Sequence, residues 1–136
     1  MAMRDIYPTT GVKSALYKAF TSGDSTTPEK GNALDIRGFN SVLFAVTANF
    51  SETDTAAFKL SVEHCDDNSS FEEATGEYIV GPSGELSEDM PVQKIGYVGA
   101  RRYVKLVVTP TTAASTATVT VAGHAILQRP EVAPVE

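Results

Sequence analysis

Hydrophobic and polar residues alternate along several stretches of this chain. Residues 40–50, NSVLFAVTANF, place an apolar side chain at every second position, and residues 57–65, AFKLSVEHC, repeat the pattern with Phe58, Leu60 and Val62 on one side. Because period two is the period of a β-strand, both stretches predict strands with one face in a core. The linker between them, SETDTA, is short and polar, so we expect the two strands to be antiparallel neighbours.

Further strands are predicted towards the end of the sequence. Residues 101–108, RRYVKLVV, and 116–127, TATVTVAGHAIL, alternate in the same way, and the loop between them makes them a second expected hairpin. Shorter candidate strands lie at residues 14–20, 33–36, 77–80 and 92–98. About eight short strands separated by turn residues predict an all-β fold, an antiparallel β-sandwich of jelly-roll type.

Both ends of the chain are rich in residues that interrupt regular structure. The first part contains many Thr, Ser, Gly and Pro residues, and the last nine residues, QRPEVAPVE, contain two prolines. We therefore expect an extended N-terminal arm over residues 1–30, a β-sandwich domain over residues 31–128 and a C-terminal tail over residues 129–136. Within the arm, KSALYKAF fits a strand as well as two helical turns.

Charge and composition exclude several classes of function. The chain has 11 Lys and Arg against 17 Asp and Glu, a formal net charge of −6, whereas a general nucleic-acid binder needs an excess of cations. No apolar run is long enough to span a bilayer, and the first residues lack a signal-peptide core, so we expect synthesis in the cytoplasm and no membrane partner. The single cysteine, Cys65, rules out an internal disulfide and any CxxC motif.

The stretch KIGYVGARRYVKLVV, Lys94 to Val108, combines four cations with two tyrosines. Gly96 and Gly99 predict a tight turn between two strands, with Arg101 and its alternate neighbours on the outer face. We interpret the stretch as a hairpin whose exposed face carries cations and their aliphatic stems. A nucleic-acid surface is the first alternative, which the acidic chain disfavours. A protein contact is the second, since Arg and Tyr are preferred at interfaces.

No motif for catalysis or for metal binding is complete. Strand alternation sends His64 and Cys65 to opposite faces, so they form no thiolate–imidazole pair, and a two-histidine metal site requires His64 to meet His124. The acidic loop at residues 66–77 lacks the glycine of a calcium loop, and the carboxylate pair Glu72 and Glu73 has no identified cleft. We expect no catalytic residue, no cofactor and no metal.

Three motifs, in this order, resemble small structural proteins of tailed bacteriophages. The first is DD-x-S-x-F at Asp66 to Phe71, the second is K-x-GY-x-G-x-x-RYV at Lys94 to Val104, and the third is GHA at Gly123 to Ala125. The resemblance covers roughly Ala33 to Leu127, most of the chain. Its motifs are turns and core positions, so they are more specific for the fold than for the function.

The resemblance implies a head decoration, or cement, protein on the virion surface. Proteins of this type bind the outer surface of the major capsid protein lattice, often as homotrimers, and we expect the same here, with both arms making contacts. Weak contacts repeated over many copies gain from multivalency. The expected contact residues are Tyr7, Leu16, Tyr17 and Phe20 in the arm and Lys94, Tyr97, Arg101, Arg102 and Tyr103 in the sandwich.

Two alternative functions remain open. One is a different virion component, such as a tail, neck or fibre-base protein. The other is a carbohydrate-binding β-sandwich, for which Tyr97 and Tyr103 are the candidate aromatic platforms. The absence of Trp weakens that interpretation.

Overall fold

The computed structural model describes residues 9–22, 26–82 and 84–130, and nearly all of its regular structure is β-strand. In chain order the strands are β1 (Gly11–Phe20), β2 (Glu29–Lys30), β3 (Leu34–Asp35), β4 (Phe39–Phe50), β5 (Ala57–Cys65), β6 (Glu72–Glu73), β7 (Ile79–Val80), β8 (Leu86–Ser87), β9 (Val92–Tyr97), β10 (Tyr103–Thr112) and β11 (Val119–Pro130). A 3-10 turn, Gly76–Tyr78, precedes β7. Within the described residues, no helix is long and apolar enough to cross a membrane.

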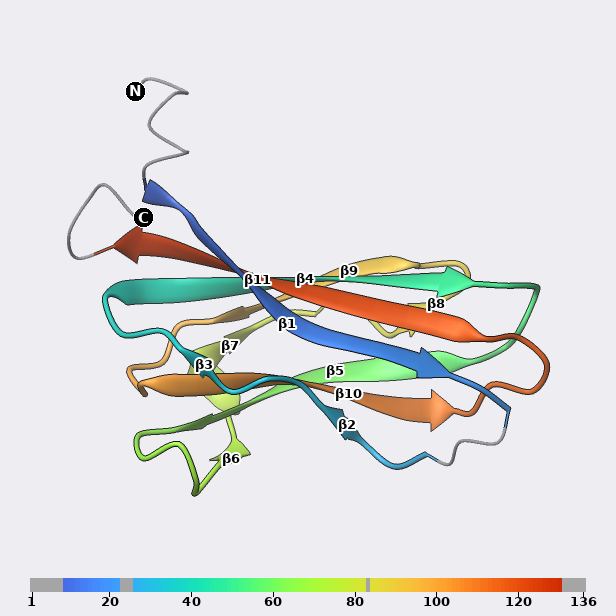
Figure 1. The fold of residues 1–136 in the computed structure, drawn as a ribbon, viewed down its shortest axis with the longest axis horizontal. Helices are drawn as coiled ribbons and strands as arrows, with labels where there is room; N and C mark the ends of the chain where they lie inside the picture. The colour runs from blue at the N-terminus through green and yellow to red at the C-terminus, as the bar shows by residue number, and fades with distance from the viewer. Residues whose placement is uncertain (1–8, 23–25, 83, 131–136) are drawn as a thin grey trace.

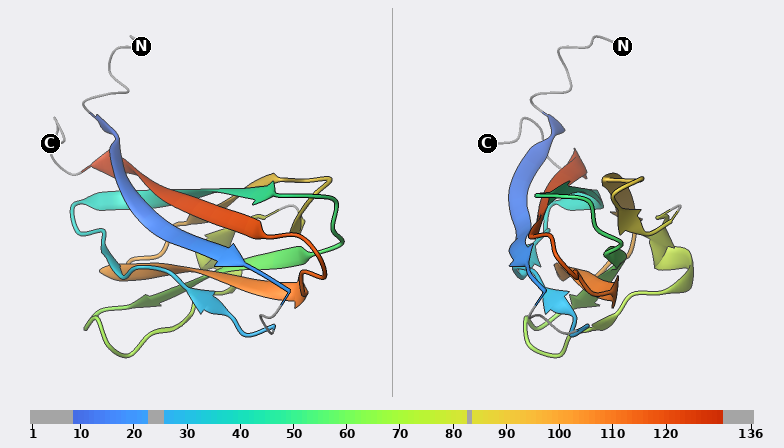
Figure 2. Two further views of the ribbon diagram at one scale, coloured as in Figure 1. Left: turned by 45° about the vertical axis from the view of Figure 1, so that its right-hand side comes forward. Right: turned by 90° about the vertical axis from the view of Figure 1, so that its right-hand side faces the viewer.

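The strands form two antiparallel sheets that pack face to face (Figures 1 and 2). Sheet A has the order β1-β11-β4-β9-β7, and sheet B has the order β2-β10-β5-β6, with β3 also on β10 and β8 also on β5. The first strand therefore lies beside the last, and most connections pass from one sheet to the other. This is the arrangement of a jelly roll, so the expected all-β sandwich is confirmed.

The expected hairpins are wrong. β4 pairs with β11 and β9 in sheet A, whereas β5 pairs with β10 in sheet B. The connections from β9 to β10 and from β10 to β11 cross between the sheets in the same way. Alternation shows which face of a strand is buried, but it does not show whether the next strand lies in the same sheet or in the opposite one. A strand buries the same face against the core in both cases. A polar loop of six residues is long enough to bridge the spacing of about 10 Å between packed sheets.

Asp54 holds the crossing loop between β4 and β5 in place. One oxygen of its buried carboxylate accepts the Ala56 N–H at 2.9 Å, within the loop. The other accepts the N–H groups of Ser115, Thr116 and Ala117 at 2.8–3.0 Å, in the loop between β10 and β11. These donors, first of all the Ala117 N–H, stabilise the charged form and hold the pKa of Asp54 well below its usual range.

The core lies between the two sheets and is filled by the alternate residues of the long strands. Val42, Phe44 and Val46 on β4 are buried, as the sequence pattern predicts, and Phe58 and Val62 on β5 face them from the other sheet. Gly123 on β11 packs closely against the opposite sheet, since a Cβ at this position would lie 2.6 Å from Leu106 Cδ2. Gly123 of the GHA motif is therefore a packing position.

Part of the expected N-terminal arm is instead strand β1 of the sandwich. Residues 11–20 pair along β11 as an edge strand of sheet A, and β2 pairs with β10. A β-bulge between Ser14 and Leu16 turns both Ala15 and Leu16 into the core, so simple alternation misjudges this strand. The C-terminal boundary also moves, because β11 continues to Pro130.

Candidate interaction surface

The two outer faces of the sandwich differ sharply in charge. The outer face of sheet B carries paired ions, among them Lys30 Nζ at 3.0 Å from Glu63 Oε2, and Lys105 Nζ lies 4.0 Å from the centre of the Phe71 ring. This pattern is typical of a solvated surface. On the outer face of sheet A, the register of the described strands places a single Lys, Arg, Asp or Glu side chain, that of Lys94. In a chain with 21% charged residues this face is exceptional.

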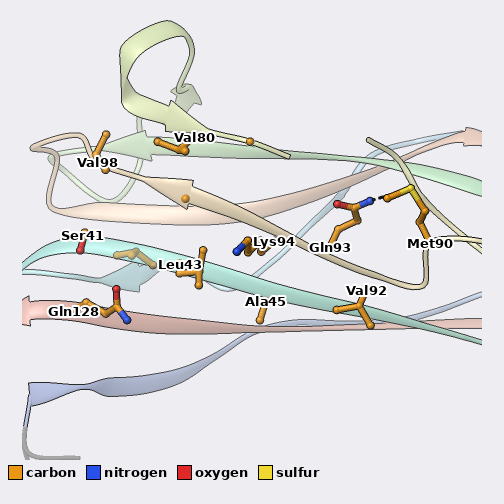
Figure 3. A pocket seen from close by; sticks show the side chains of 13 residues that line it. Ser41, Leu43, Ala45, Val80, Met90, Val92, Gln93, Lys94, Val98 and Gln128 are labelled. Carbon is orange, nitrogen blue, oxygen red and sulfur yellow. Dashed lines mark hydrogen bonds between the residues drawn. The ribbon is translucent and has the colours of Figure 1, made fainter. Parts of the chain in front are cut away.

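A groove of about 770 Å³ lies on this face, along β4 and β9 (Figure 3). Its walls include large apolar side chains that are 45–63% exposed: Val80, Met90, Val92 and Val98. Gln93 Nε2 lies 3.7 Å from Met90 Sδ. Exposed apolar side chains that gather in one hollow are typical of surfaces that contact another molecule, so the groove is the candidate contact surface. We call the outer face of sheet A, with this groove, the sheet A face.

Strand β9 carries an apolar side chain on each of its faces, Ile95 in the core and Val92 on the outer face. Gln93, Ile95 and Tyr97 point into the core, while Val92 and Lys94 point outward. A strand exposed on one face normally alternates apolar with polar residues. The exposed Val92 is the sequence signal for the groove, and our sequence analysis missed it because it used apolar positions only to find the core.

The expected contact residues are divided among several places. Lys94 lines the groove, and Tyr17, which is 73% exposed, lies on the same face over β1. Leu16, Phe20 and Tyr97 are core residues, so their assignment as contact residues is wrong. Arg101 and Arg102 lie in the loop between β9 and β10, and Tyr103 is half-buried on the outer face of sheet B, where the Arg102 guanidinium lies 5.0 Å from its ring. Tyr7 lies outside the described residues.

Tyr97 forms a buried polar pair with His64. The Tyr97 hydroxyl lies 2.8 Å from His64 Nδ1, and the Arg101 N–H donates to the same oxygen at 3.3 Å. Because that N–H already donates to the Tyr97 oxygen, we assign the hydroxyl proton to the bond with His64 Nδ1. The His64 ring then carries its own proton on Nε2, which lies 3.9 Å from Glu72 Oε1. Gly99 has no room for a side chain, since a Cβ there would overlap the Tyr97 ring.

A polar pocket of about 580 Å³ opens beside this pair, and several of the charges that line it are paired within the chain. Arg101 lies 3.3 Å from Asp66 Oδ2 and 3.2 Å from Glu72 Oε1 at the mouth of the pocket. Burial first, and the Arg101 charge second, lower the pKa of His64, so the imidazole is neutral at pH 7.

The structure does not bring together the other residues that the sequence analysis considered for catalysis or metal binding. Cys65 is buried beside His64 in sequence, yet strand alternation turns the two side chains to opposite faces of sheet B. His64 lies in the core and His124 lies exposed on the sheet A face, so the two histidines do not meet and form no metal site together. Within residues 9–22, 26–82 and 84–130, no three His, Cys, Asp or Glu side chains are placed to hold a metal ion.

We expect the stability of the protein to fall as the pH drops from 7.5 to 5.5. The folded state holds the pKa of His64 below its value of 6.5, so the unfolded state binds a proton that the folded state resists. His64 therefore does not reduce the stability above pH 6.5, where both states leave it neutral. Below pH 6.5 the unfolded state gains a proton, and the unfolding equilibrium constant rises by no more than about tenfold per pH unit. Urea titrations across this range measure the slope.

A His64→Gln variant is the control for this prediction. Glutamine keeps a polar group near Tyr97 but does not titrate, so its stability should change little over the same pH range, whatever its absolute value. An equal slope in both proteins would assign the pH dependence to another group. The lowered carboxylate pKa values act only below about pH 4, outside this window.

Comparisons with known proteins identify no family for this chain. No protein-family model matches the chain, and neither does any curated protein. Xylanase 10B of Clostridium thermocellum, solved as its CBM22-1 and GH10 modules with xylohexaose, is 13% identical with a TM-score of 0.40, over 96% of this chain and 28% of that chain. The SPBc2 prophage-derived protein YomS is 15% identical with a TM-score of 0.35, over 86% of this chain and 92% of that chain. The chain thus spans little more than a quarter of the xylanase chain, and both are distant structural neighbours.

Proposed function

We propose that this chain is a non-enzymatic structural protein of a tailed-bacteriophage virion, a head decoration protein that binds the outer surface of the major capsid protein lattice and stabilises the capsid. The observation that carries the proposal is the contrast between the two outer faces of the jelly roll. One face is grooved, and its described strands place Lys94 there as the single charged side chain, which suits a docking surface; the other face carries paired ions, as a surface in water does.

The motifs of the phage resemblance support the fold that this function needs. In the first motif, Asp67 Oδ1 accepts the N–H groups of Ser69 and Ser70 at 3.0 and 2.8 Å and so fixes the turn after β5. In the second, Tyr97 is buried, and Arg102 binds Asp35 through two hydrogen bonds of 3.2 and 2.8 Å. These contacts make a rigid sandwich, which a protein that reinforces a shell requires.

The sheet A face is the surface that we assign to the lattice. Burying this face removes apolar surface from water and leaves no carboxylate without a partner, which keeps the desolvation cost low. Lys94 at the groove offers a single cation for an acidic group on the lattice. Because a shell presents many identical sites, a modest affinity at each site is sufficient.

Among the alternative functions, a tail, neck or fibre-base component would use the same face on a different part of the particle. The carbohydrate-binding interpretation loses its expected platform. Tyr97 is fully buried, and the ring of Tyr103 is partly covered by Arg102. Stacking on sugars requires an exposed aromatic face, so that interpretation has no support from these two residues.

Two glutamates in the groove should abolish binding to the capsid. We expect the variant Val80→Glu, Val92→Glu to lose about 100-fold or more in affinity, because each buried carboxylate lacks a partner. Both side chains are about 60% exposed, so the fold should be unaffected. Cosedimentation with purified capsids that lack this protein measures the loss, and circular dichroism checks the fold.

The matched control adds the same charge elsewhere. Thr55→Glu, Thr109→Glu places two carboxylates on the β4–β5 loop and on the outer face of sheet B, and it should bind capsids as the wild type does. Equal binding by the groove variant would remove the sheet A face as the docking surface. Binding of the wild type to purified tails but not to capsids would favour the tail component instead.

A further inference from the structure

The polar pocket beside His64 lies at the end of the sandwich where β5 finishes and β10 begins, on the left in Figure 1. We call this pocket, which includes Glu72, Tyr78 and Arg101 in its walls, the end pocket. Its volume of about 580 Å³ is typical of a site for a small molecule. The residues that line it and those that line the groove on the sheet A face are two separate sets, so the two sites can be occupied independently.

His64 offers the end pocket a hydrogen-bond donor that no group of the described chain accepts. Its side chain is only 6% exposed, and its Nδ1 accepts the Tyr97 hydroxyl at 2.8 Å, so the ring proton is on Nε2. Glu72 Oε1 lies 3.9 Å from Nε2, which is too far for a hydrogen bond. A donor this far inside a protein is normally paired. A ligand oxygen in the end pocket would supply the partner that the described chain does not.

The charges around the end pocket favour a neutral ligand. Asp66, Glu72 and Glu73 are among its lining residues, against the guanidinium of Arg101, so an anion is repelled. A cation would meet the Nε2–H of His64 and the charge of Arg101, which lies 3.3 Å from Asp66 Oδ2 and 3.2 Å from Glu72 Oε1. Arg101 keeps further N–H donors, and each of these two carboxylates keeps a second oxygen. The pocket therefore suits a neutral ligand whose groups both donate and accept hydrogen bonds, as hydroxyl groups do.

Tyr78 forms an aromatic wall beside these polar groups. The residue is 43% exposed, and the centre of its ring lies 5.7 Å from the centre of the His64 ring. The backbone of Tyr78 is anchored on both sides, since its N–H donates to the Thr75 carbonyl at 3.4 Å and its carbonyl accepts the Val98 N–H at 2.9 Å. A sugar ring has an apolar C–H face and a rim of hydroxyl groups. It therefore matches an aromatic ring that stands next to hydrogen-bond donors and acceptors.

We propose that the end pocket binds a neutral sugar, with the sugar ring against Tyr78 and its hydroxyl groups on His64 Nε2–H and on the free oxygen of Glu72. This function goes beyond capsid docking, and it leaves the sheet A face free. It does not use the aromatic platforms expected from the sequence, because Tyr97 acts inside the protein, where it fixes the proton position on His64. A virion that displays the chain in many copies would hold a polysaccharide through many weak sites at once.

The test is an NMR titration of the isotope-labelled full chain with the methyl glycosides of glucose, galactose, mannose and N-acetylglucosamine. We expect at least one of them to shift the amide signals of residues 64–78 and 99–102, with a dissociation constant of about 1–10 mM, the order expected for a ligand of this size. In a long-range proton–nitrogen spectrum, the free His64 ring should carry its proton on Nε2, and that proton should exchange more slowly once the sugar is bound. N-acetylneuraminic acid, which is anionic, should leave these signals unchanged.

Two variants of the end pocket and one control test which residues hold the sugar. Tyr78→Ala should weaken binding about tenfold or more, because it removes the wall against which the sugar ring lies. Glu72→Ala, at a side chain that is 63% exposed, is the second variant and should weaken binding about fivefold. Tyr17→Ala removes an exposed tyrosine on the sheet A face and should bind the sugar as the wild type does. The amide spectrum of each variant also shows whether it is folded.

Several outcomes would overturn the proposal. One is a spectrum that none of the four glycosides changes, or in which only signals of the sheet A face move. Another is a folded Tyr78→Ala variant that binds the sugar as tightly as the wild type, and a third is a His64 ring protonated on Nδ1. Spermidine that binds more tightly than every sugar would make the end pocket a cation site instead. Capsid binding is measured separately: Val80→Glu, Val92→Glu should still bind the sugar, and Tyr78→Ala should still sediment with capsids.

Discussion

Replacing Gly31 by alanine should destabilise the protein by about 2–4 kcal/mol, because there is no space for a Cβ between the two sheets at this position. Gly31 lies where β1 of sheet A approaches β10 of sheet B. Its N–H donates to the Leu106 carbonyl at 2.8 Å, and the Asn32 N–H donates to the Ala15 carbonyl at 2.8 Å. A Cβ at Gly31 would overlap the Ala15 carbonyl oxygen. Backbone atoms of two strands cannot move aside as a side chain can, so the side of the sandwich has to open.

Urea denaturation of the variant, compared with Gly84→Ala, measures this effect. A Cβ at Gly84 would meet nothing closer than Met90 Sδ at 3.8 Å, so that substitution should change the stability by only a few tenths of a kcal/mol. The comparison separates the loss of space from the general effect of glycine replacement. Equal midpoints for the two variants would show that the close approach of β1 and β10 does not limit the fold.

Replacing Asp54 by asparagine should lower Tm by about 5–10 °C, since several backbone N–H groups lose a charged acceptor. An amide keeps the size of the carboxylate but presents an NH₂ group to donors that need an oxygen. The loops between β4 and β5 and between β10 and β11 would then lose their common anchor. Asp89→Asn, at an exposed position, is the matched control and should leave Tm within about 1 °C.

The pH dependence of the same variant checks the mechanism. The folded state depresses the pKa of Asp54, so the wild type gains stability above the unfolded pKa of about 4 and loses it as the pH falls below that value. Asp35, whose pKa is lowered to about 2 chiefly by its hydrogen bond to Arg102, acts in the same direction in both proteins. The difference between wild type and Asp54→Asn should therefore shrink in acid. A difference that stays constant down to pH 2 would exclude the carboxylate charge as its cause.

The sequence was sufficient to predict the strands but not their partners. Alternation at Val42, Phe44 and Val46 identifies a buried face, and burial confirms it. The same alternation contains no information about which strand lies alongside. The loop after β4 crosses to the other sheet, and it is anchored by hydrogen bonds that Asp54 accepts from backbone N–H groups about sixty positions away. Such long-range contacts are invisible in a local pattern.

The contact surface was predicted only in part, for two physical reasons. Leu16 and Phe20 were assigned to an arm, but their segment pairs with β11 in sheet A, so both are in the core, while Tyr17 between them is outside. Tyr97 has a polar group, and we assigned it to the surface, yet His64 satisfies its hydroxyl inside the protein. Both errors concern side chains whose surroundings are set by tertiary packing.

The pairing of β1 with β11 determines when this protein is able to fold during its synthesis. Sheet A brings residue 20 beside residue 119, so its edge cannot form until almost the whole described chain has left the ribosome. Since successive long strands belong to different sheets, no early hairpin is available to organise the nascent chain. Folds dominated by such distant pairings typically form over milliseconds to seconds. The nascent polypeptide is therefore exposed to premature association with its neighbours until translation is nearly complete.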